Sequence, residues 1–186
     1  MALSYYGFML DVSRHFMPPE DVCRLLDAAA LCGVNTMHWH LTDDQGWRVE
    51  IRKYPLLTQV GSRRGATHFG RVSETENNCG YYTQEQIRSL VAYAQDRGIQ
   101  IIPEIDIPGH ASALLAAYPQ FGCRRTVVGA GEEETVVEAP YDYQVLTTGG
   151  IYPNLICAGK DEALRFLEDI LDELTELFPA LSLIHI

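Results

Sequence analysis

Three short apolar segments are each followed by an amphipathic helical pattern, and this alternation limits the folds open to the chain. The segments cover residues 8–12, 34–41 and 99–105, and the last is apolar at nearly every position, as expected for a strand with both faces covered. Strands that alternate with helices pair in parallel through right-handed crossovers. The chain is therefore predicted to be an α/β protein with a parallel sheet.

Turn and capping residues predict the ends of the helices. Prolines at residues 18–19 begin the first helix and Gly33 ends it, whereas a Thr83-x-x-Gln86 capping box begins the second. We expect Asp161 to cap a third helix that stops at a proline. The apolar stripe of this helix is expected at Leu164, Leu167, Leu171, Leu174 and Phe178.

Two long polar connections favour a barrel over a doubly wound sheet. They cover residues 42–82 and 108–160, and they follow the carboxyl ends of the second and third strands, where barrel enzymes build their sites. The Gly-rich phosphate turn of a dinucleotide fold is missing at residues 11–15, after the first strand. We predict the first half of a (β/α)8 TIM barrel over residues 1–186, with about four strands and three helices, the fourth strand being residues 181–186.

The acidic composition argues against two classes of partner. Lys and Arg number 14 against 25 Asp and Glu, and the net charge of −11 disfavours nucleic acid and anionic membranes. The five cysteines are scattered without a Cys-x-x-Cys pair and are expected to be reduced, structural thiols. The first six residues do not resemble a signal peptide, and the sequence assigns no compartment.

The segment His-Trp-His-Leu-Thr-Asp-Asp-Gln-Gly-Trp-Arg carries the first group of reactive side chains. Strand alternation places His38 and His40 on one face, toward the barrel axis, and the apolar residues between them on the other. Asp43 and Asp44 then emerge at the carboxyl end of the strand. A structural pair of hydrogen-bonded histidines and a functional site both fit this segment.

A second group follows on the third strand, in the segment Pro-Glu-Ile-Asp-Ile-Pro-Gly-His. Glu104 and Asp106 share one strand face, and the prolines and glycine that follow present His110 at the rim. A stiff loop whose carboxylates bind arginine or backbone amides is the alternative interpretation. Asp11 and Arg14, at the end of the first strand, are expected to form a structural salt bridge.

Four segments together resemble one enzyme family. They are Gly7-Phe-Met-Leu-Asp-Val-Ser-Arg-His-Phe16, His38-Trp-His-Leu-Thr-Asp-Asp-Gln-Gly-Trp-Arg48, Tyr82-Thr-Gln-Glu-Gln-Ile87 and Ile102-Pro-Glu-Ile-Asp-Ile-Pro-Gly-His110. In this order they resemble glycoside hydrolase family 20, which contains the β-N-acetylhexosaminidases. The resemblance continues to Pro179 and so covers nearly the whole chain.

The resemblance implies a cofactor-free, retaining hydrolase that removes terminal, non-reducing β-linked N-acetylglucosamine or N-acetylgalactosamine from glycans. In this family the substrate's 2-acetamido oxygen is the nucleophile, an Asp orients it, and the adjacent Glu is the general acid. Both belong to a Gly-Asp-Glu motif that would begin just after Ile186. We therefore expect the 186-residue chain to lack this pair and to be an inactive half-barrel that binds sugar weakly at most.

The resemblance also implies that the chain keeps residues that support the missing acid. His110 matches the histidine that hydrogen-bonds this Glu, and Asp43 matches the carboxylate that orients His110. Tyr6 stands where the family usually has an arginine that grips sugar hydroxyls, which leaves the sugar preference open. The residues expected to bind the substrate are Asp44, Glu104, Asp106 and His40.

Two further alternatives stay open. The His38-x-His40 pair resembles a metal-binding pair of a metal-dependent hydrolase, but such a site needs more ligands from later strands, and we predict no metal. Residues 181–186 match both a native fourth strand and the translation of an end sequence used in transposase-based sequencing libraries. We hypothesise that they are a non-native tail.

Overall fold

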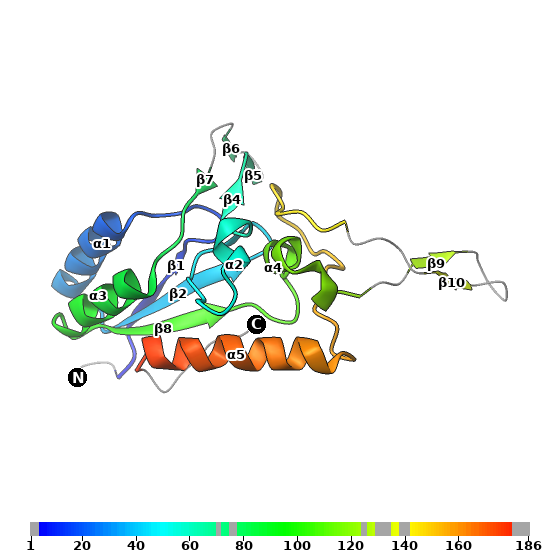
Figure 1. The fold of residues 1–186 in the computed structure, drawn as a ribbon. Coiled ribbons are helices and arrows are strands. Elements are labelled where there is room, and N and C mark those ends of the chain that lie inside the picture. Colours follow the sequence, from blue (N-terminus) through cyan, green and yellow to red (C-terminus); the bar gives the residue numbers. More distant parts are fainter. Residues whose placement is uncertain are drawn as a thin grey trace.

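Three parallel strands form the centre of the structure (Figure 1). β1 (Gly7–Asp11) and β8 (Gln100–Ile105) lie on either side of β2 (Thr36–Asp43), which pairs in parallel with both. The computed structural model describes residues 4–69, 72–74, 78–123, 126–128, 135–137 and 142–179. The predicted parallel sheet is confirmed, and within these ranges it is open rather than closed.

The two faces of β2 have opposite characters. Met37, Trp39 and Leu41 are fully buried on the apolar face, while His38 and His40 alternate with them along the strand. The strand ends at Asp43, where the two-residue β3 (Gly46–Trp47) turns back and pairs with it antiparallel. The predicted division of β2 between an apolar and a histidine-bearing face is therefore confirmed.

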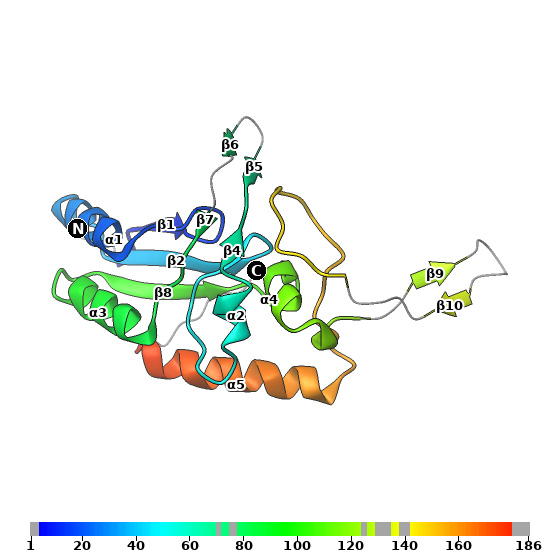
Figure 2. The same ribbon diagram turned by 45° about the horizontal axis from the view of Figure 1, so that its top comes forward.

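A helix follows each parallel strand and packs beside the sheet (Figures 1 and 2). The three are α1 (Pro19–Leu31), α3 (Gln84–Gln95) and α5 (Asp161–Leu177). The capping box is confirmed, because the Gln86 N–H donates to Thr83 Oγ1 at 3.2 Å and the Thr83 N–H donates to Gln86 Oε1 at 2.9 Å. Gly33 follows α1 with a φ of 75°, a left-handed conformation that favours glycine.

The start and the apolar face of α5 differ from the prediction. Asp161 is the first helical residue rather than the cap; Lys160 holds the N-cap position and no side chain caps the helix. The acidic charge still suits the positive end of the helix dipole. The buried residues of α5 are Ala163, Phe166, Ile170, Leu174 and Leu177.

Part of the predicted stripe faces a hollow instead of the core. Leu164 is 47% exposed, and Leu167 and Leu171 are half-buried. Together with Ile105 and Ile107 these three leucines line an apolar hollow of about 420 Å³ between α5 and the end of β8. Helical periodicity correctly detected apolar side chains on this face, but it could not tell a packed face from an open one.

The two long connections carry short elements of their own. The first contains β3, α2 (Leu56–Gln59), β4 (Arg63–Arg64), β5 (Thr67–Phe69), β6 (Val72–Glu74) and β7 (Asn78–Cys79). The second contains α4 (Ser112–Ala117), a 3-10 turn (Pro119–Phe121), β9 (Thr126–Val128) and β10 (Thr135–Val137). β9 and β10 form a hairpin that projects away from the sheet (Figure 2).

Residues 181–186 lie outside the described residues, so the predicted fourth strand and the hypothesis of a non-native tail stay predictions. In the ranges that the structure describes, none of the helices combines the length and the apolar character needed to cross a bilayer.

A buried arginine holds the first connection together. Arg48 is fully buried, and burial together with the neighbouring Arg64 lowers its pKa to about 10, which leaves it charged at neutral pH. Its guanidinium donates five hydrogen bonds of 2.8–3.0 Å. The acceptors are the carbonyls of Val12, Ser13, Ser62 and Gly80 and the Oδ1 of Asn78.

We predict that Arg48→Met destabilises the fold by about 3 kcal/mol or more, because it leaves several buried acceptors without a donor. Chemical denaturation followed by circular dichroism measures this loss. Arg52→Met is the matched control: Arg52 is exposed and pairs with Glu85 at the surface, so its loss is expected to cost about 0.5 kcal/mol or less. Equal losses for the two variants would contradict the structural role of Arg48.

Candidate active site

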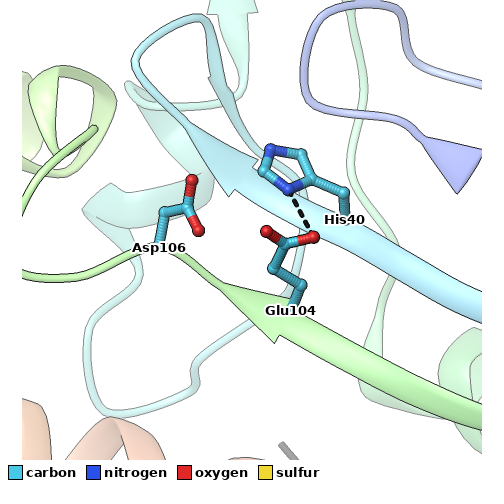
Figure 3. A group of neighbouring side chains, drawn as sticks. All are labelled: His40, Glu104 and Asp106. Carbon is cyan, nitrogen blue, oxygen red and sulfur yellow. Dashed lines mark ion pairs between the residues drawn. The ribbon is translucent and has the colours of Figure 1, made fainter. Parts of the chain in front are cut away.

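A buried histidine lies between two carboxylates at the carboxyl end of the sheet. His40 is 2% exposed; its Nε2 lies 3.1 Å from Asp43 Oδ2 and its Nδ1 lies 2.8 Å from Glu104 Oε2. The strand register causes the second contact, because His40 of β2 is directly opposite Glu104 of β8. His38, two residues earlier on the same face, also pairs with Glu104. Figure 3 shows His40 and Glu104 pointing toward one another.

The surrounding acids keep His40 protonated. Burial opposes the charged form, but the hydrogen bond to Asp43 and the negative charges of Asp11 and Glu104 outweigh it and raise the pKa of His40 to about 9. The pKa of Asp43 is lowered. Burial opposes its ionisation, but the hydrogen bond to His40 and the positive charge of Arg14 outweigh this effect. His40 and Asp43 therefore form a buried ion pair at neutral pH.

Asp106 completes the group in Figure 3, and its pKa is raised, whereas the pKa of Asp43 is lowered. Ligand atoms of His40, Glu104 and Asp106 all lie within 4.8 Å of one another; Glu104 belongs to β8 and Asp106 directly follows that strand. Asp106 Oδ1 and Glu104 Oε1 are buried and accept no hydrogen bond within the described ranges, whereas Glu104 Oε2 is paired with the two histidines of β2. Burial, together with the negative charges of Asp43 and Glu104, raises the pKa of Asp106 to about 7 in spite of nearby His40.

Arg14 belongs to the site, although the sequence predicted only a structural role. The predicted salt bridge to Asp11 is confirmed at 3.0 Å. Arg14 also pairs with Asp43, donates to Gln45 Oε1 at 2.9 Å, and lies 2.9 Å from His40 Nε2. The position of Arg14 just after β1 was the available signal, because parallel strands bring their carboxyl ends to one edge.

His110 reaches the same edge from the loop after β8. Its Nδ1 lies 3.0 Å from Asp44 Oδ2 and 3.2 Å from Asp43 Oδ1. Its φ is 47°, a conformation that costs a non-glycine residue free energy, and residues held in such conformations cluster at active sites. The side chain is about one-third exposed, and within the described residues its Nε2 has no hydrogen-bond partner.

Asp44 is the carboxylate that fixes the loop carrying His110. It is 1% exposed, and its Oδ1 accepts the Ser112 N–H at 3.0 Å as well as the Ser112 hydroxyl. Asn154 in turn donates to Ser112 Oγ at 2.9 Å. The resemblance assigned the orienting role to Asp43 alone, whereas here Asp44 makes the hydrogen bond to His110 and Asp43 makes a second contact. No sequence pattern indicated Ser112 or Asn154.

Tyr6 is not brought into this cluster. It precedes β1 at the amino end of the sheet, its side chain is 45% exposed, and its N–H donates to Asn35 Oδ1 at 2.9 Å. Asp11 lies at the other end of the same strand. The effect of Tyr6 on sugar preference stays a prediction.

A metal ion fits this cluster poorly. His40, Glu104 and Asp106 have the right spacing for three ligands, as do Asp43, Asp44 and His110. However, a metal ion at the first group would have to displace the proton of His40, whose pKa is about 9. Arg14 also places a positive charge 2.9 Å from its Nε2. The chemistry of this set favours a charge-paired network over the metal-dependent alternative.

Comparison with known proteins agrees with this fold. The chain matches the profile "Glycosyl hydrolase family 20, catalytic domain" over residues 3–186. It is 46% identical over 178 residues to a β-hexosaminidase of Porphyromonas gingivalis, covering 96% of this chain and 20% of that protein. It is 40% identical to a β-hexosaminidase of Vibrio furnissii, covering 98% of this chain and 28% of that one.

Solved structures show the same likeness. A crystal structure of a β-N-acetylhexosaminidase superposes with a TM-score of 0.80 at 39% identity, covering 95% of this chain and 34% of that one. The Vibrio harveyi GH20 exo-β-N-acetylglucosaminidase, in complex with N-acetylglucosamine, gives a TM-score of 0.72 at 36% identity, with 96% and 26% covered. The fold is thus part of a TIM-barrel glycoside hydrolase. The chain belongs to glycosyl hydrolase family 20, and it spans about a fifth to a third of the relatives' length.

We predict that the stability of the chain falls as the pH rises from about 6.5 to about 9. The pKa of His40 is raised in the folded state, from 6.5 to about 9. Its contribution is therefore complete below pH 6.5 and is lost as the pH rises through about 9. NMR titration of the imidazole, together with urea unfolding across this range, measures both effects.

Asp43→Asn is the matched variant for this titration. It removes the negative charge of the carboxylate that accepts a hydrogen bond from His40, and it keeps the size of the side chain. The pKa of His40 is expected to fall in this variant, so the alkaline loss of stability is expected to be smaller and to end at lower pH. A His40 resonance that titrates at its ordinary value in the unmodified chain would contradict the buried ion pair.

Proposed function

We propose that this chain is the N-terminal half of the catalytic domain of a β-N-acetylhexosaminidase, which hydrolyses terminal, non-reducing β-linked N-acetylglucosamine or N-acetylgalactosamine residues of glycans. The matching relatives are named β-hexosaminidases, and one of the matching structures is a complex with N-acetylglucosamine. In this proposal the substrate's acetamido oxygen attacks the anomeric carbon while a general acid protonates the departing oxygen.

The arrangement of His110 is the observation that carries the proposal. Two buried carboxylates, Asp43 and Asp44, hold its Nδ1, which fixes the tautomer and the orientation of the ring. The Nε2 is left for a partner at the rim, where a barrel glycosidase places its acid. We propose that His110 positions and tunes the acid Glu, and that Asp43 and Asp44 position His110.

The contacts within the cluster give different roles to the four residues that the sequence assigned to substrate binding. The oxygens of Asp44 are taken up by His110 and Ser112, so we propose that it acts on the sugar only through His110. Asp106 has a buried oxygen that no described residue hydrogen-bonds, and its pKa is about 7; both properties suit a hydrogen bond to a sugar hydroxyl. We propose that Glu104 and His40 hold Asp106 in place from the neighbouring positions.

The reacting pair itself is not among these 186 residues, since a Gly-Asp-Glu sequence occurs nowhere in the chain. We predict that the isolated chain does not hydrolyse a chromogenic N-acetylglucosaminide and binds N-acetylglucosamine weakly at most. Continuous absorbance assays and NMR titration with the sugar measure these two properties. A longer protein that includes this segment and the Gly-Asp-Glu motif is the positive control. Turnover by the isolated chain would contradict the proposal that the reacting pair lies outside these 186 residues.

In such a longer protein we predict that His110→Asn lowers kcat by on the order of 100-fold, because the general acid loses the group that tunes it. The alkaline limb of the pH–rate profile, where the general acid loses its proton, is expected to move, which a merely structural loss would not cause. His68→Asn is the matched control, since His68 is exposed and bonds Ser73 outside the cluster. An unchanged kcat and pH profile in His110→Asn would contradict the role proposed for His110.

A further inference from the structure

Two cysteines lie together on the second long connection, apart from the acidic cluster. Cys123 follows the 3-10 turn, Cys157 precedes α5, and their thiols hydrogen-bond to one another. The backbone holds them in place: Gly122 and Ile156 form an antiparallel bridge, and the Cys157 N–H donates to the Phe121 carbonyl at 2.8 Å. The main chain therefore brings the segments that carry the two cysteines side by side.

Both thiols are accessible, and one is activated. Cys123 is exposed and Cys157 is half-buried. Hydrogen bonds from Cys123 and from the Gly159 N–H, with a smaller contribution from the charge of Lys160, lower the pKa of the Cys157 thiol. A larger thiolate fraction makes a cysteine a better nucleophile in thiol–disulfide exchange.

We propose that Cys123 and Cys157 form an intramolecular disulfide and are a redox-sensitive modification site of this protein. A small-molecule disulfide such as oxidised glutathione is the oxidant. The Cys157 thiolate attacks one of its sulfurs and displaces a glutathione thiolate. Cys123 loses its proton to solvent and attacks the Cys157 sulfur, which displaces the second. The protein loses two protons and two electrons, and the oxidant becomes two thiols.

The disulfide would close the connection that supports the candidate active site. Within the described residues 142–156, the segment between the two cysteines makes three hydrogen bonds of 2.8–3.0 Å to site residues. They join the Leu146 N–H to the Asp44 carbonyl, Gln45 Nε2 to the Thr148 carbonyl, and Asn154 Nδ2 to Ser112 Oγ. Joining the two ends of this segment restricts its opening.

Peptide mapping tests the proposal directly on the full 186-residue chain. Trypsin cleavage at Lys and Arg puts each of the five cysteines on a separate peptide; Cys123 lies on residues 98–124 and Cys157 on residues 126–160. After incubation with oxidised glutathione and digestion without reductant, we expect these two peptides to be joined. Dithiothreitol is expected to separate them. Separate glutathione adducts on Cys123 and Cys157, or pairing of either with another cysteine, would overturn the proposal.

Single substitutions distinguish a specific pair from general thiol reactivity. In Cys123→Ser, Cys157 is expected to stop at the glutathione adduct because no second thiol resolves it, while Cys32→Ser keeps the crosslink because Cys32 lies at the end of α1. Circular dichroism checks that each variant is folded.

Oxidation is also expected to slow amide exchange at Leu146 and Ile156 about tenfold, as loop closure restricts local opening. Unchanged exchange in the crosslinked chain would overturn the supporting role of the disulfide.

Discussion

The ion pairs around His40 connect all three parallel strands. His40 and Asp43 belong to β2, Glu104 belongs to β8, and Arg14 extends from the end of β1 to Asp43. Burying so many charges is costly unless each has a partner of opposite sign, and a packed apolar set would serve stability at least as well. A buried charge network at the carboxyl edge of a sheet is therefore better explained by chemistry at that edge than by folding.

The network also separates the proton affinities of neighbouring groups. Opposite charges keep His40 protonated and Asp43 ionised, while burial beside like charges brings Asp106 to a pKa of about 7. Groups a few ångströms apart thus hold their protons over different pH ranges, which is how enzymes assign distinct roles to chemically similar side chains. His110 and Asp44 lie at the open side of this network and link it to the loop after β8.

Much of this arrangement could be predicted from the sequence because it follows from strand alternation. Alternation places His40 and Glu104 on the polar faces of two adjacent strands, while their direct pairing depends on a register that the sequence does not fix. Contacts made by loop residues could not be predicted, since Ser112 and Asn154 reach Asp44 through backbone paths with no periodic pattern. The face of α5 was misjudged for a related reason: apolar spacing reports which side chains are apolar, not what lies opposite them.

The five hydrogen bonds of Arg48 bear on how the chain folds. Their acceptors come from the end of β1, from the segment before β4, and from β7 and the residue after it. A buried guanidinium with only some of these acceptors in place is less stable than one exposed to water, so intermediates in which β2 is formed and the first connection is detached are disfavoured. The segments around Arg48 are therefore expected to order together, in one cooperative step that joins the sheet to the connection carrying β4 and β7.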